Sequence, residues 1–311
     1  MKIGLALGGG VALGFYHVGL LKALEKLEIK IDIVSGTSIG AVIGGVYALT
    51  QSAKEVEGRL FEIINEHQKE LSLLKTSFSP ANVEAKTAFF EKWFDLAKEF
   101  YIWNLRIAKS SLVDLKPFLK IFRGLFEDNS FKDCKVPFYV TAVNLLNAEV
   151  IAINSGPLYR GVLASSAYPG FFPPLKIENK VLIDGGVLMP VPAKIIRDKV
   201  DFIIGVNLEG TGYKFPSARN AMDVMNIADR IRYKRIIEES LGGIDFLISP
   251  NLENFSWGDF TIAKELMQKG ESEVLAQGKE LKAALRANRY MELNPFKKFF
   301  NFSLPLKHKQ G

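Results

Sequence analysis

Short runs of apolar residues alternate along the chain with segments whose apolar residues recur at helical spacing. The runs KIGLAL (2–7) and DIVSG (32–36) are each followed by a helical segment, over residues 15–28 and 39–50. Later runs of the same kind are VPFYVTAVNL, EVIAIN, KVLIDGG and FIIGVNL. Continuously apolar strands that alternate with helices are typical of a buried, mainly parallel sheet. The pattern therefore predicts an α/β fold.

The helical segment at residues 15–28 is amphipathic, whereas the one at 39–50 is apolar nearly all round. In the first, valine and leucine occupy one face and lysine and glutamate the other, as in a helix with one buried side. The second contains Gly44 and Gly45, and glycine lowers the stability of a helix interior. We therefore expect these two glycines to allow close packing against another backbone.

Much of the remaining chain has a helical pattern. Residues 52–130 are irregular, and aromatic side chains crowd the segment 89–105. This aromatic stripe indicates one or two amphipathic helices that cover the sheet, and the alternative is a lid or a lipid-facing surface. Residues 219–240 and 259–288 each predict one further charged helix.

No internal repeat or clear linker interrupts the chain before residue 290, so we predict one domain over residues 1–290 and a basic, aromatic tail over 291–311. The formal net charge is +6, and the four lysines between residues 295 and 311 account for most of it, since 6 − 4 leaves +2. These lysines are interleaved with four phenylalanines, which suits an anionic membrane surface. A packed or disordered C-terminus is the alternative. Nucleic-acid binding is not expected, because it needs a larger basic face.

Composition narrows the class of protein further. A single cysteine, Cys134, excludes an intramolecular disulfide framework and any multi-cysteine metal site. The opening MKIGLALGGG is not a typical signal peptide, because three glycines break its apolar run and no small-residue cleavage site follows. No apolar run reaches the roughly 18–20 residues that a membrane span needs. We expect a cytoplasmic protein that is at most peripheral at the membrane.

The turn between the second strand and the second helix carries a candidate nucleophile. Gly36-Thr37-Ser38-Ile39-Gly40 fits the G-x-S-x-G nucleophile elbow, in which a strained strand-to-helix turn exposes a serine. The flanking Gly36 and Gly40 let the neighbouring backbone approach, and the start of a helix favours a developing oxyanion. The alternative is a glycine-rich turn with a helix-capping serine.

A second glycine cluster, Gly8-Gly9-Gly10, also lies between a strand and a helix. Such a loop presents backbone N–H groups, which can bind a phosphate or stabilise an oxyanion. Its spacing to Gly14 approaches the dinucleotide-binding fingerprint, which also requires an acid at the end of the next strand. Here Asp32 precedes that strand, and this weakens the nucleotide-binding alternative.

The candidate nucleophile needs a base that accepts its proton. The chain's three histidines, His17, His67 and His308, do not follow strands as a triad histidine normally does. Asp184 does follow a strand, in KVLIDGG, and the glycines after it allow close approach. A carboxylate can serve as base only within hydrogen-bond reach of the hydroxyl, in a site that excludes water. On this segment alone, a β-turn aspartate is the alternative.

Three segments together resemble the patatin-like phospholipase family. They are LALGGGVALGFYHVGLLKALEK, GTSIGAVIGG and ASSAYPGFFPPLKIENKVLIDGGVLMPVP, in the family's order and spacing. The resemblance is close over residues 1–50 and 136–210, looser over 111–133 and 259–280, and absent over 52–110 and in the tail. It implies a three-layer α/β/α fold with a mainly parallel central sheet, and a lipid acyl hydrolase that uses a Ser–Asp dyad.

The resemblance also implies roles for individual residues. The matched residues are the nucleophile Ser38, the base Asp184 and the oxyanion-hole glycines Gly8, Gly9 and Gly10. The stretch 164–174 matches a family segment that we interpret as site scaffold. Leu13 departs from the pattern, because family members commonly carry Arg or Lys there, and the anchoring of the glycine loop is thereby left open. No cofactor and no metal is implied.

Two functions of different class follow from the sequence. The favoured one is a serine lipid acyl hydrolase of the phospholipase A, lysophospholipase or carboxylesterase type. The alternative is a catalytically weak scaffold of the same fold that binds lipid or membrane, which the loss of a basic residue at Leu13 suggests. A nucleotide-binding enzyme is a third and weaker hypothesis. The sequence does not specify the lipid, its chain length or the oligomeric state.

Overall fold

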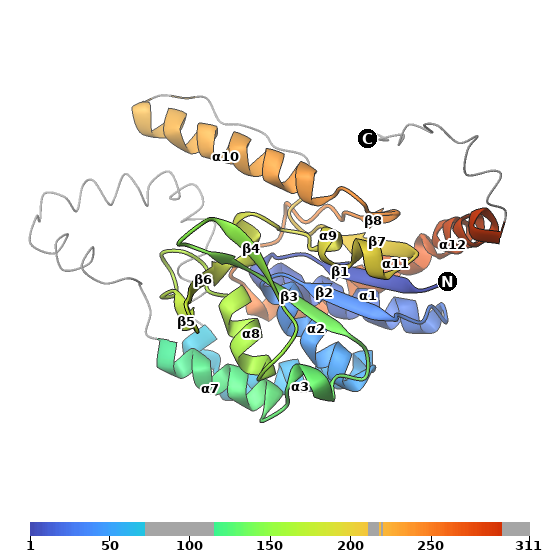
Figure 1. Cartoon of the computed structure of the whole chain (residues 1–311), viewed down its shortest axis with the longest axis horizontal. Coiled ribbons are helices and arrows are strands. Elements are labelled where there is room, and N and C mark those ends of the chain that lie inside the picture. Colours follow the sequence, from blue (N-terminus) through green and yellow to red (C-terminus); the bar gives the residue numbers. More distant parts are fainter. Residues whose placement is uncertain (72–114, 211–217, 219, 294–311) are drawn as a thin grey trace, which may run out of the picture.

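The computed structural model describes residues 1–71, 115–210, 218 and 220–293, and an eight-stranded sheet forms the centre of this part of the chain (Figure 1). The strands are β1 (Ile3–Leu7), β2 (Ile33–Gly36), β3 (Phe138–Asn144), β4 (Glu149–Ile153), β5 (Leu175–Ile177), β6 (Lys180–Asp184), β7 (Phe202–Val206) and β8 (Phe246–Ile248). Their order is β5-β6-β3-β2-β1-β7-β8, and β4 pairs with β3 outside this path.

Parallel pairing dominates the sheet. Strand β1 runs parallel to both β2 and β7, β2 runs parallel to β3, and β7 runs parallel to β8. The strands β4 and β6 are antiparallel to β3, and β5 is antiparallel to β6. The predicted α/β fold with a mainly parallel sheet is therefore confirmed, with antiparallel pairing confined to one side.

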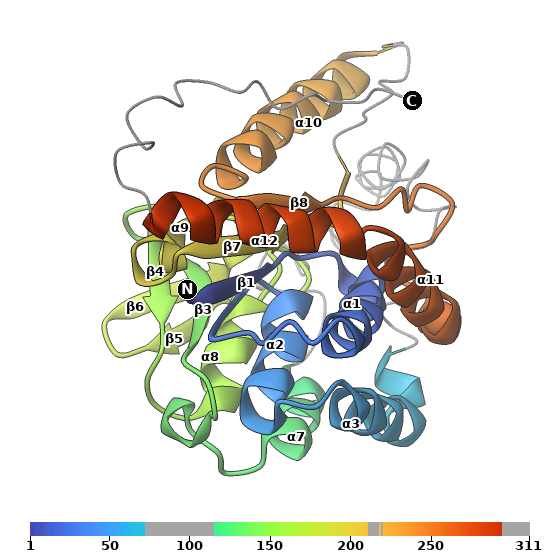
Figure 2. The same ribbon diagram turned by 90° about the vertical axis from the view of Figure 1, so that its right-hand side faces the viewer.

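Helices cover the two faces of the sheet unequally (Figures 1 and 2). On one side α2 and α8 pack against the strands, with α1, α3, α7 and α11 around them, and on the other lies the short α9. The bounds are α1 (Phe15–Lys26), α2 (Ile39–Thr50), α3 (Ala53–Glu66), α7 (Leu115–Phe126), α8 (Leu158–Ser165), α9 (Ala193–Ile196), α10 (Ala221–Ser240), α11 (Ala263–Ala276) and α12 (Gly278–Leu293).

Side-chain alternation along the strands creates two cores. Leu5 and Leu7 of β1 point into the large core beneath α1 and α2, whereas Ala6 belongs to a smaller core on the opposite face. The smaller core also contains Ile203 of β7 and Ile196 of α9. This gives the three layers that the family resemblance implies, with a thin second helical layer.

Three of the predicted helices are matched closely and one is divided. The predicted segments 15–28, 39–50 and 219–240 correspond to α1, α2 and α10. The single helix predicted over 259–288 is instead two, α11 and α12, which are separated at Gln277. The aromatic segment 89–105 and the tail from residue 294 lie outside the described residues.

The expectation for Gly44 and Gly45 is wrong. A Cβ at either glycine would meet side chains, among them those of Phe126 and Phe138, rather than another backbone. The close backbone contact occurs elsewhere, between α1 and α11, where a Cβ at Gly19 would collide with the carbonyl oxygen of Met267. Glycine is thus required where two helices cross at backbone distance.

Gly19→Ala is expected to destabilise the protein by about 2 kcal/mol or more, because the added methyl group forces α1 and α11 apart. Gly58→Ala is the matched control, since nothing lies within 4 Å of a Cβ at Gly58 in α3. That control is expected to stabilise by about 0.5–1 kcal/mol through helix propensity. Urea unfolding of both variants measures the difference, and equal effects of the two substitutions would contradict the packing argument.

None of the helices within the described ranges is long and apolar enough to cross a bilayer. Because α12 ends at Leu293 and the tail lies beyond the described residues, membrane contact through the tail stays a prediction.

Candidate active site

The strand β3 brings the two candidate catalytic segments together. Strand β4 pairs with β3 over Val140–Asn144, a range that overlaps the pairings of both β2 and β6 with β3. A strand has only two edges, so β2 and β6 must share the edge opposite β4. Gly36 at the end of β2 pairs with Val140, and Asp184 at the end of β6 pairs with Ala142. The ends of β2 and β6 therefore meet on one edge of β3.

Ser38 occupies a strained turn at the start of α2. Its φ is 55° and its ψ is −123°, a conformation that costs a non-glycine residue about 1–3 kcal/mol. The flanking glycines make the turn sterically feasible. A Cβ at Gly40 would collide with the carbonyl oxygen of Leu7, and one at Gly36 would lie 2.6 Å from the backbone of Ala41. The turn is thus strained and closely packed, and the role of Ser38 as nucleophile stays a prediction.

Thr37 links the elbow by a hydrogen bond to the segment that follows Asp184. Its Oγ1 donates to the carbonyl oxygen of Met189 at 2.9 Å, and it lies 2.6 Å from Oγ1 of Thr141 on β3. Since the Met189 carbonyl can only accept, Thr141 donates to Thr37. Sequence analysis missed both threonines as supporting residues, although Thr37 lies inside the GTSIG motif.

The backbone of the candidate nucleophile is held by a second serine. The N–H of Ser38 donates to Oγ of Ser165, at 2.9 Å, and Ser165 is fully buried at the end of α8. The stretch 164–174, interpreted from the sequence as scaffold, therefore contacts the elbow directly. Because this N–H already has a partner, it is less available to an oxyanion.

The glycine loop after β1 is fixed by its own backbone. The N–H of Gly8 donates to the carbonyl oxygen of Val206 at 3.0 Å, and the N–H of Gly9 donates to that of Pro190 at 3.2 Å. These two N–H groups hold the loop against β7 and the segment after Asp184. They are occupied within the protein rather than directed at a ligand.

Beyond Gly9 the loop offers unpaired donors beside Ser38. A Cβ at Gly9 would lie 3.5 Å from Cβ of Ser38, so the loop passes directly along the elbow. The N–H groups of Gly10 and Val11 make no hydrogen bond to any part of the chain that the structure describes. The unusual φ angles of 150° at Gly10 and 49° at Val11 turn the backbone at this point. Of the three predicted glycines, Gly10 is thus the one with an unpaired N–H.

Leu13, which stands where the family commonly has a basic residue, is buried in the large core with 1% of its surface exposed. Its N–H donates to the carbonyl oxygen of Gly10 at 3.0 Å, and the N–H of Ala12 donates to that of Trp257 at 2.9 Å. Apolar burial and backbone hydrogen bonds therefore anchor the end of the loop without a charge at this position.

Neither histidine in the described part of the chain supplies a base to Ser38. His17 is fully buried, and its Nε2 is bonded to the carbonyl oxygen of Gly8 at 2.9 Å. His67 follows α3 and lies 3.9 Å from the Glu70 carboxylate, whereas His308 is outside the described residues. The two described histidines are therefore poor candidates for the base.

Asp184 is a buried carboxylate, with 2% of its surface exposed. Its Oδ1 accepts from the N–H of Gly186 at 2.7 Å, and its own N–H donates to the carbonyl oxygen of Ala167 at 3.0 Å. Oδ2 is buried without a hydrogen-bond partner among the described residues. Burial raises the pKa of Asp184 to about 7, although the Gly186 N–H and the Ser38 hydroxyl both lower it. The Ser38 hydroxyl therefore lies near Asp184, without a hydrogen bond of ordinary geometry.

Two tyrosines that sequence analysis did not single out lie within electrostatic range of Asp184. Although 44% of the surface of Tyr168 is exposed, desolvation of its hydroxyl and the charges of Glu209 and Asp184 raise its pKa to about 12. The same causes raise the pKa of Tyr233, on α10, whose hydroxyl donates to Oε1 of Glu209 at 2.8 Å. Both phenols stay protonated at neutral pH, so they add no charge near the carboxylate, and the Tyr233 proton is donated to Glu209.

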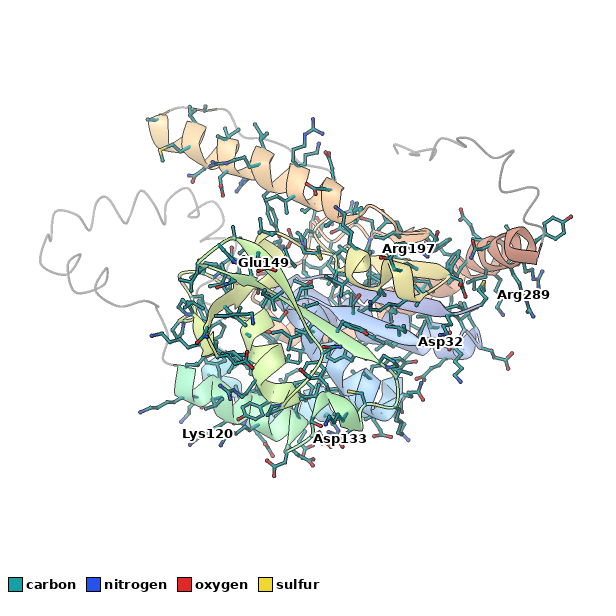
Figure 3. The ribbon with its side chains drawn as sticks, in the orientation of Figure 1. Asp32, Lys120, Asp133, Glu149, Arg197 and Arg289 are labelled. Carbon is teal, nitrogen blue, oxygen red and sulfur yellow. The ribbon has the colours of Figure 1, made fainter. Side chains whose placement is uncertain are left out.

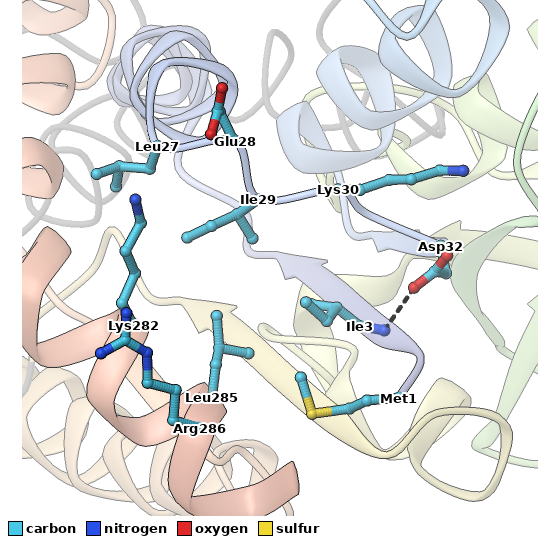
Figure 4. Close-up of a pocket in the computed structure, with 10 residues that line it drawn as sticks. All are labelled: Met1, Ile3, Leu27, Glu28, Ile29, Lys30, Asp32, Lys282, Leu285 and Arg286. Atoms are coloured by element: carbon cyan, nitrogen blue, oxygen red, sulfur yellow. Dashed lines mark hydrogen bonds between the residues drawn. The ribbon is translucent and has the colours of Figure 1, made fainter.

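Asp32 lies at the opposite end of the sheet from the glycine loop. Its Oδ2 accepts from the N–H of Ile3 at 2.8 Å, where β1 begins, whereas the loop follows the end of β1 (Figures 3 and 4). Asp32 therefore cannot bind a ribose at that loop, and the nucleotide-binding hypothesis lacks the acidic residue that it requires.

An open hollow of about 470 Å³ lies at the same edge of the sheet as Asp32 and is lined by Asp32, Lys282 and Leu285 among others (Figure 4). Like Asp32, it is remote from Ser38. Within the described ranges, no group of three or more His, Cys, Asp or Glu could hold a metal ion.

Comparison with known proteins finds relatives that are described as phospholipases. The family described as patatin-like phospholipase matches residues 5–197. A patatin-like phospholipase domain-containing protein of Caenorhabditis elegans is 32% identical over 63% of this chain and 13% of its own length. The lysophospholipase NTE1 of Debaryomyces hansenii is 27% identical over 69% of this chain and 12% of its own length. The chain thus corresponds to a small part of these relatives.

Among solved structures, VipD from Legionella pneumophila is similar, with a TM-score of 0.43 and 17% identity over 89% of this chain and 67% of that one. This likeness is too distant to assign the fold by itself. The family match is stronger, because it extends over more than half of the chain and includes the elbow, the glycine loop and Asp184. On that basis the chain belongs to the patatin-like phospholipase family.

Proposed function

We propose that the protein is a serine lipid acyl hydrolase that cleaves carboxylic esters by acyl transfer to Ser38. The observation that carries this proposal is the strained serine beside a buried carboxylate, Asp184, whose Oδ2 has no hydrogen-bond partner among the described residues. An unpaired buried oxygen of raised pKa is suited to accept a proton near neutral pH.

In the first step, Oγ of Ser38 attacks the ester carbonyl carbon while Oδ2 of Asp184 accepts the hydroxyl proton. The negative charge that develops on the carbonyl oxygen is stabilised by the N–H groups of Gly10 and Val11 and by the positive end of α2. Collapse of the tetrahedral adduct breaks the bond to the alcohol oxygen, which takes the proton from Asp184. An acylated Ser38 remains.

In the second step, water replaces the alcohol. Asp184 accepts a proton from the water as its oxygen attacks the acyl carbon, and the same N–H groups stabilise the second adduct. The bond to Oγ of Ser38 then breaks, Ser38 recovers its proton, and the fatty acid is released. Both steps use one base and one set of donors, and neither requires a histidine.

The substrate class follows from the family rather than from a described cavity. The relatives are described as patatin-like phospholipases and a lysophospholipase. We therefore propose a phospholipid, a lysophospholipid or a related ester as substrate. The scaffold alternative rests on Leu13, and its burial within a backbone-anchored loop does not favour that alternative.

Hydrolysis of p-nitrophenyl esters of short and long acyl chains, followed from pH 4 to 9, tests the proposal. Asp184 must be ionised to act as base, and its pKa is about 7. We expect kcat/KM to rise about tenfold per pH unit up to roughly 7 and then to level off. Each sample is made alkaline before the product is read, so that the ionisation of p-nitrophenol does not enter the profile.

Two results would contradict these expectations separately. A rise in kcat/KM centred near pH 4 would show either that the pKa of Asp184 is not raised or that Asp184 is not the base. No hydrolysis above background at any pH would contradict the hydrolase itself, and binding to liposomes without hydrolysis would then favour the scaffold.

A further inference from the structure

A buried histidine, His17, lies against the glycine loop and takes no part in the proposed proton transfer. It is near the start of α1 and is fully buried. Its Nε2 lies 2.9 Å from the carbonyl oxygen of Gly8. Because a carbonyl oxygen only accepts, Nε2 carries the proton and the other ring nitrogen, Nδ1, is an acceptor.

The second ring nitrogen of His17 makes this side chain costly. Nδ1 is buried and has no hydrogen-bond partner among the described residues. An unpaired buried acceptor lowers stability, and an apolar side chain of the same size would avoid that loss. Burial also lowers the pKa of His17 to about 4, so the ring is neutral at neutral pH. Neither a charge nor a gain in stability explains why this position is a histidine. The remaining reason is the hydrogen bond from Nε2 to the carbonyl oxygen of Gly8.

That hydrogen bond acts on one peptide group of the glycine loop. The carbonyl oxygen of the Gly8–Gly9 peptide accepts from His17, and the N–H of the same peptide donates to Pro190 at 3.2 Å. The peptide plane is therefore held at both of its polar ends. Without His17, the plane would be held at its N–H end alone.

The neighbouring peptide groups show why this plane matters. The preceding one is also held twice, since the carbonyl oxygen of Leu7 accepts from Thr37 at 3.1 Å and the N–H of Gly8 donates to Val206 at 3.0 Å. The following one carries the N–H of Gly10, which has no partner within the described ranges. The direction of this N–H is therefore fixed by the φ and ψ of Gly9 relative to the plane that His17 holds.

We propose that His17 is a positioning residue for acyl transfer: as a neutral donor, it fixes the Gly8–Gly9 peptide so that the Gly10 N–H stays directed at the oxyanion. This inference rests on the proposed function. In this arrangement the neutral side chain of His17 anchors the glycine loop, although Leu13 replaces the basic residue that is common in the family.

His17→Gln and His17→Met form a matched pair. In glutamine, Nε2 is separated from Cα by the same number of bonds as Nε2 of histidine, so it can donate to Gly8. Methionine has a similar size and places a methyl group there, which cannot donate. For p-nitrophenyl ester hydrolysis we expect kcat of His17→Met to fall about 10–100-fold with KM within about twofold. We expect His17→Gln to keep kcat within about threefold of the parent protein, and His17→Met to be at least as resistant to urea as His17→Gln.

The possible failures are distinguishable. An inactive parent protein would contradict the proposed function. An active parent whose kcat is unchanged in His17→Met, or a loss of kcat and stability that is equal in the two variants, would contradict positioning alone. The tautomer gives an independent readout on the unmodified protein: ¹⁵N shifts of the His17 ring at pH 7 are expected to show a proton on Nε2 only. A proton on Nδ1 would overturn the proposal even if both variants failed to fold.

Discussion

Ser38→Ala is expected to lower the rate of ester hydrolysis by at least about 10⁴-fold, because the substitution removes the oxygen that attacks the ester. Reaction with a fluorophosphonate probe is expected to stop as well, since the probe bonds to the attacking oxygen. Hydrolysis and labelling measured side by side on the purified variant give the result. Activity that survives the substitution would assign the chemistry to another group.

Ser38→Gly provides a control that separates activity from stability. Alanine keeps the Cβ atom that strains the turn at φ 55°, whereas glycine adopts this conformation without that cost. We therefore expect Ser38→Gly to be inactive and about 1 kcal/mol more stable than Ser38→Ala. Equal urea stability of the two variants would mean that the elbow carries little strain.

Asp184→Asn is expected to abolish most of the activity and to stabilise the protein at alkaline pH. Asparagine cannot accept the Ser38 proton, so the rate should fall about 10³–10⁴-fold. The pKa of Asp184 is raised from 3.8 to about 7 in the folded protein. Between these values the folded state binds the proton more tightly than the unfolded state, so the parent protein loses stability as pH rises.

The size of that loss follows from the same pKa values, and it amounts to up to about 4 kcal/mol above pH 7. Asp184→Asn carries no charge at this buried position, so the variant does not lose this stability as the pH rises. Urea unfolding at pH 4 and at pH 8 is the measurement. We expect similar stability of the two proteins at pH 4 and an advantage of the variant at pH 8. A variant that is less stable than the parent at pH 8 would contradict the buried, high-pKa carboxylate.

Local patterns in the sequence predicted the N-terminal half of the candidate site well. β1, the glycine loop and α1 lie within a few residues of their predicted bounds, as do β2, the elbow and α2. Here the strand ends, the helix begins and the glycines are all encoded in one short segment. Sequence analysis also singled out Asp184, by the glycines that follow it.

Long-range pairing was not visible in the sequence. Nothing local shows that β2 and β6 share one edge of β3, or that Thr141 and Ser165 reach the elbow across that junction. The division of the segment 259–288 at Gln277 was also missed, because the charged pattern continues through the break. The three-residue strands β5 and β8 are too short to produce a periodic signal.

The shared edge of β3 also has a kinetic consequence. Ser38 and Asp184 approach each other only when strands from residues 33–36, 138–144 and 180–184 have paired, and contacts so far apart in the chain form slowly during folding. Helical hydrogen bonds join residues only four apart, so helical turns can form much earlier, before α1 packs against α11. The proposed activity should therefore appear late in refolding, after most of the helical signal has returned, and a nascent chain that ends before β6 would carry Ser38 without Asp184.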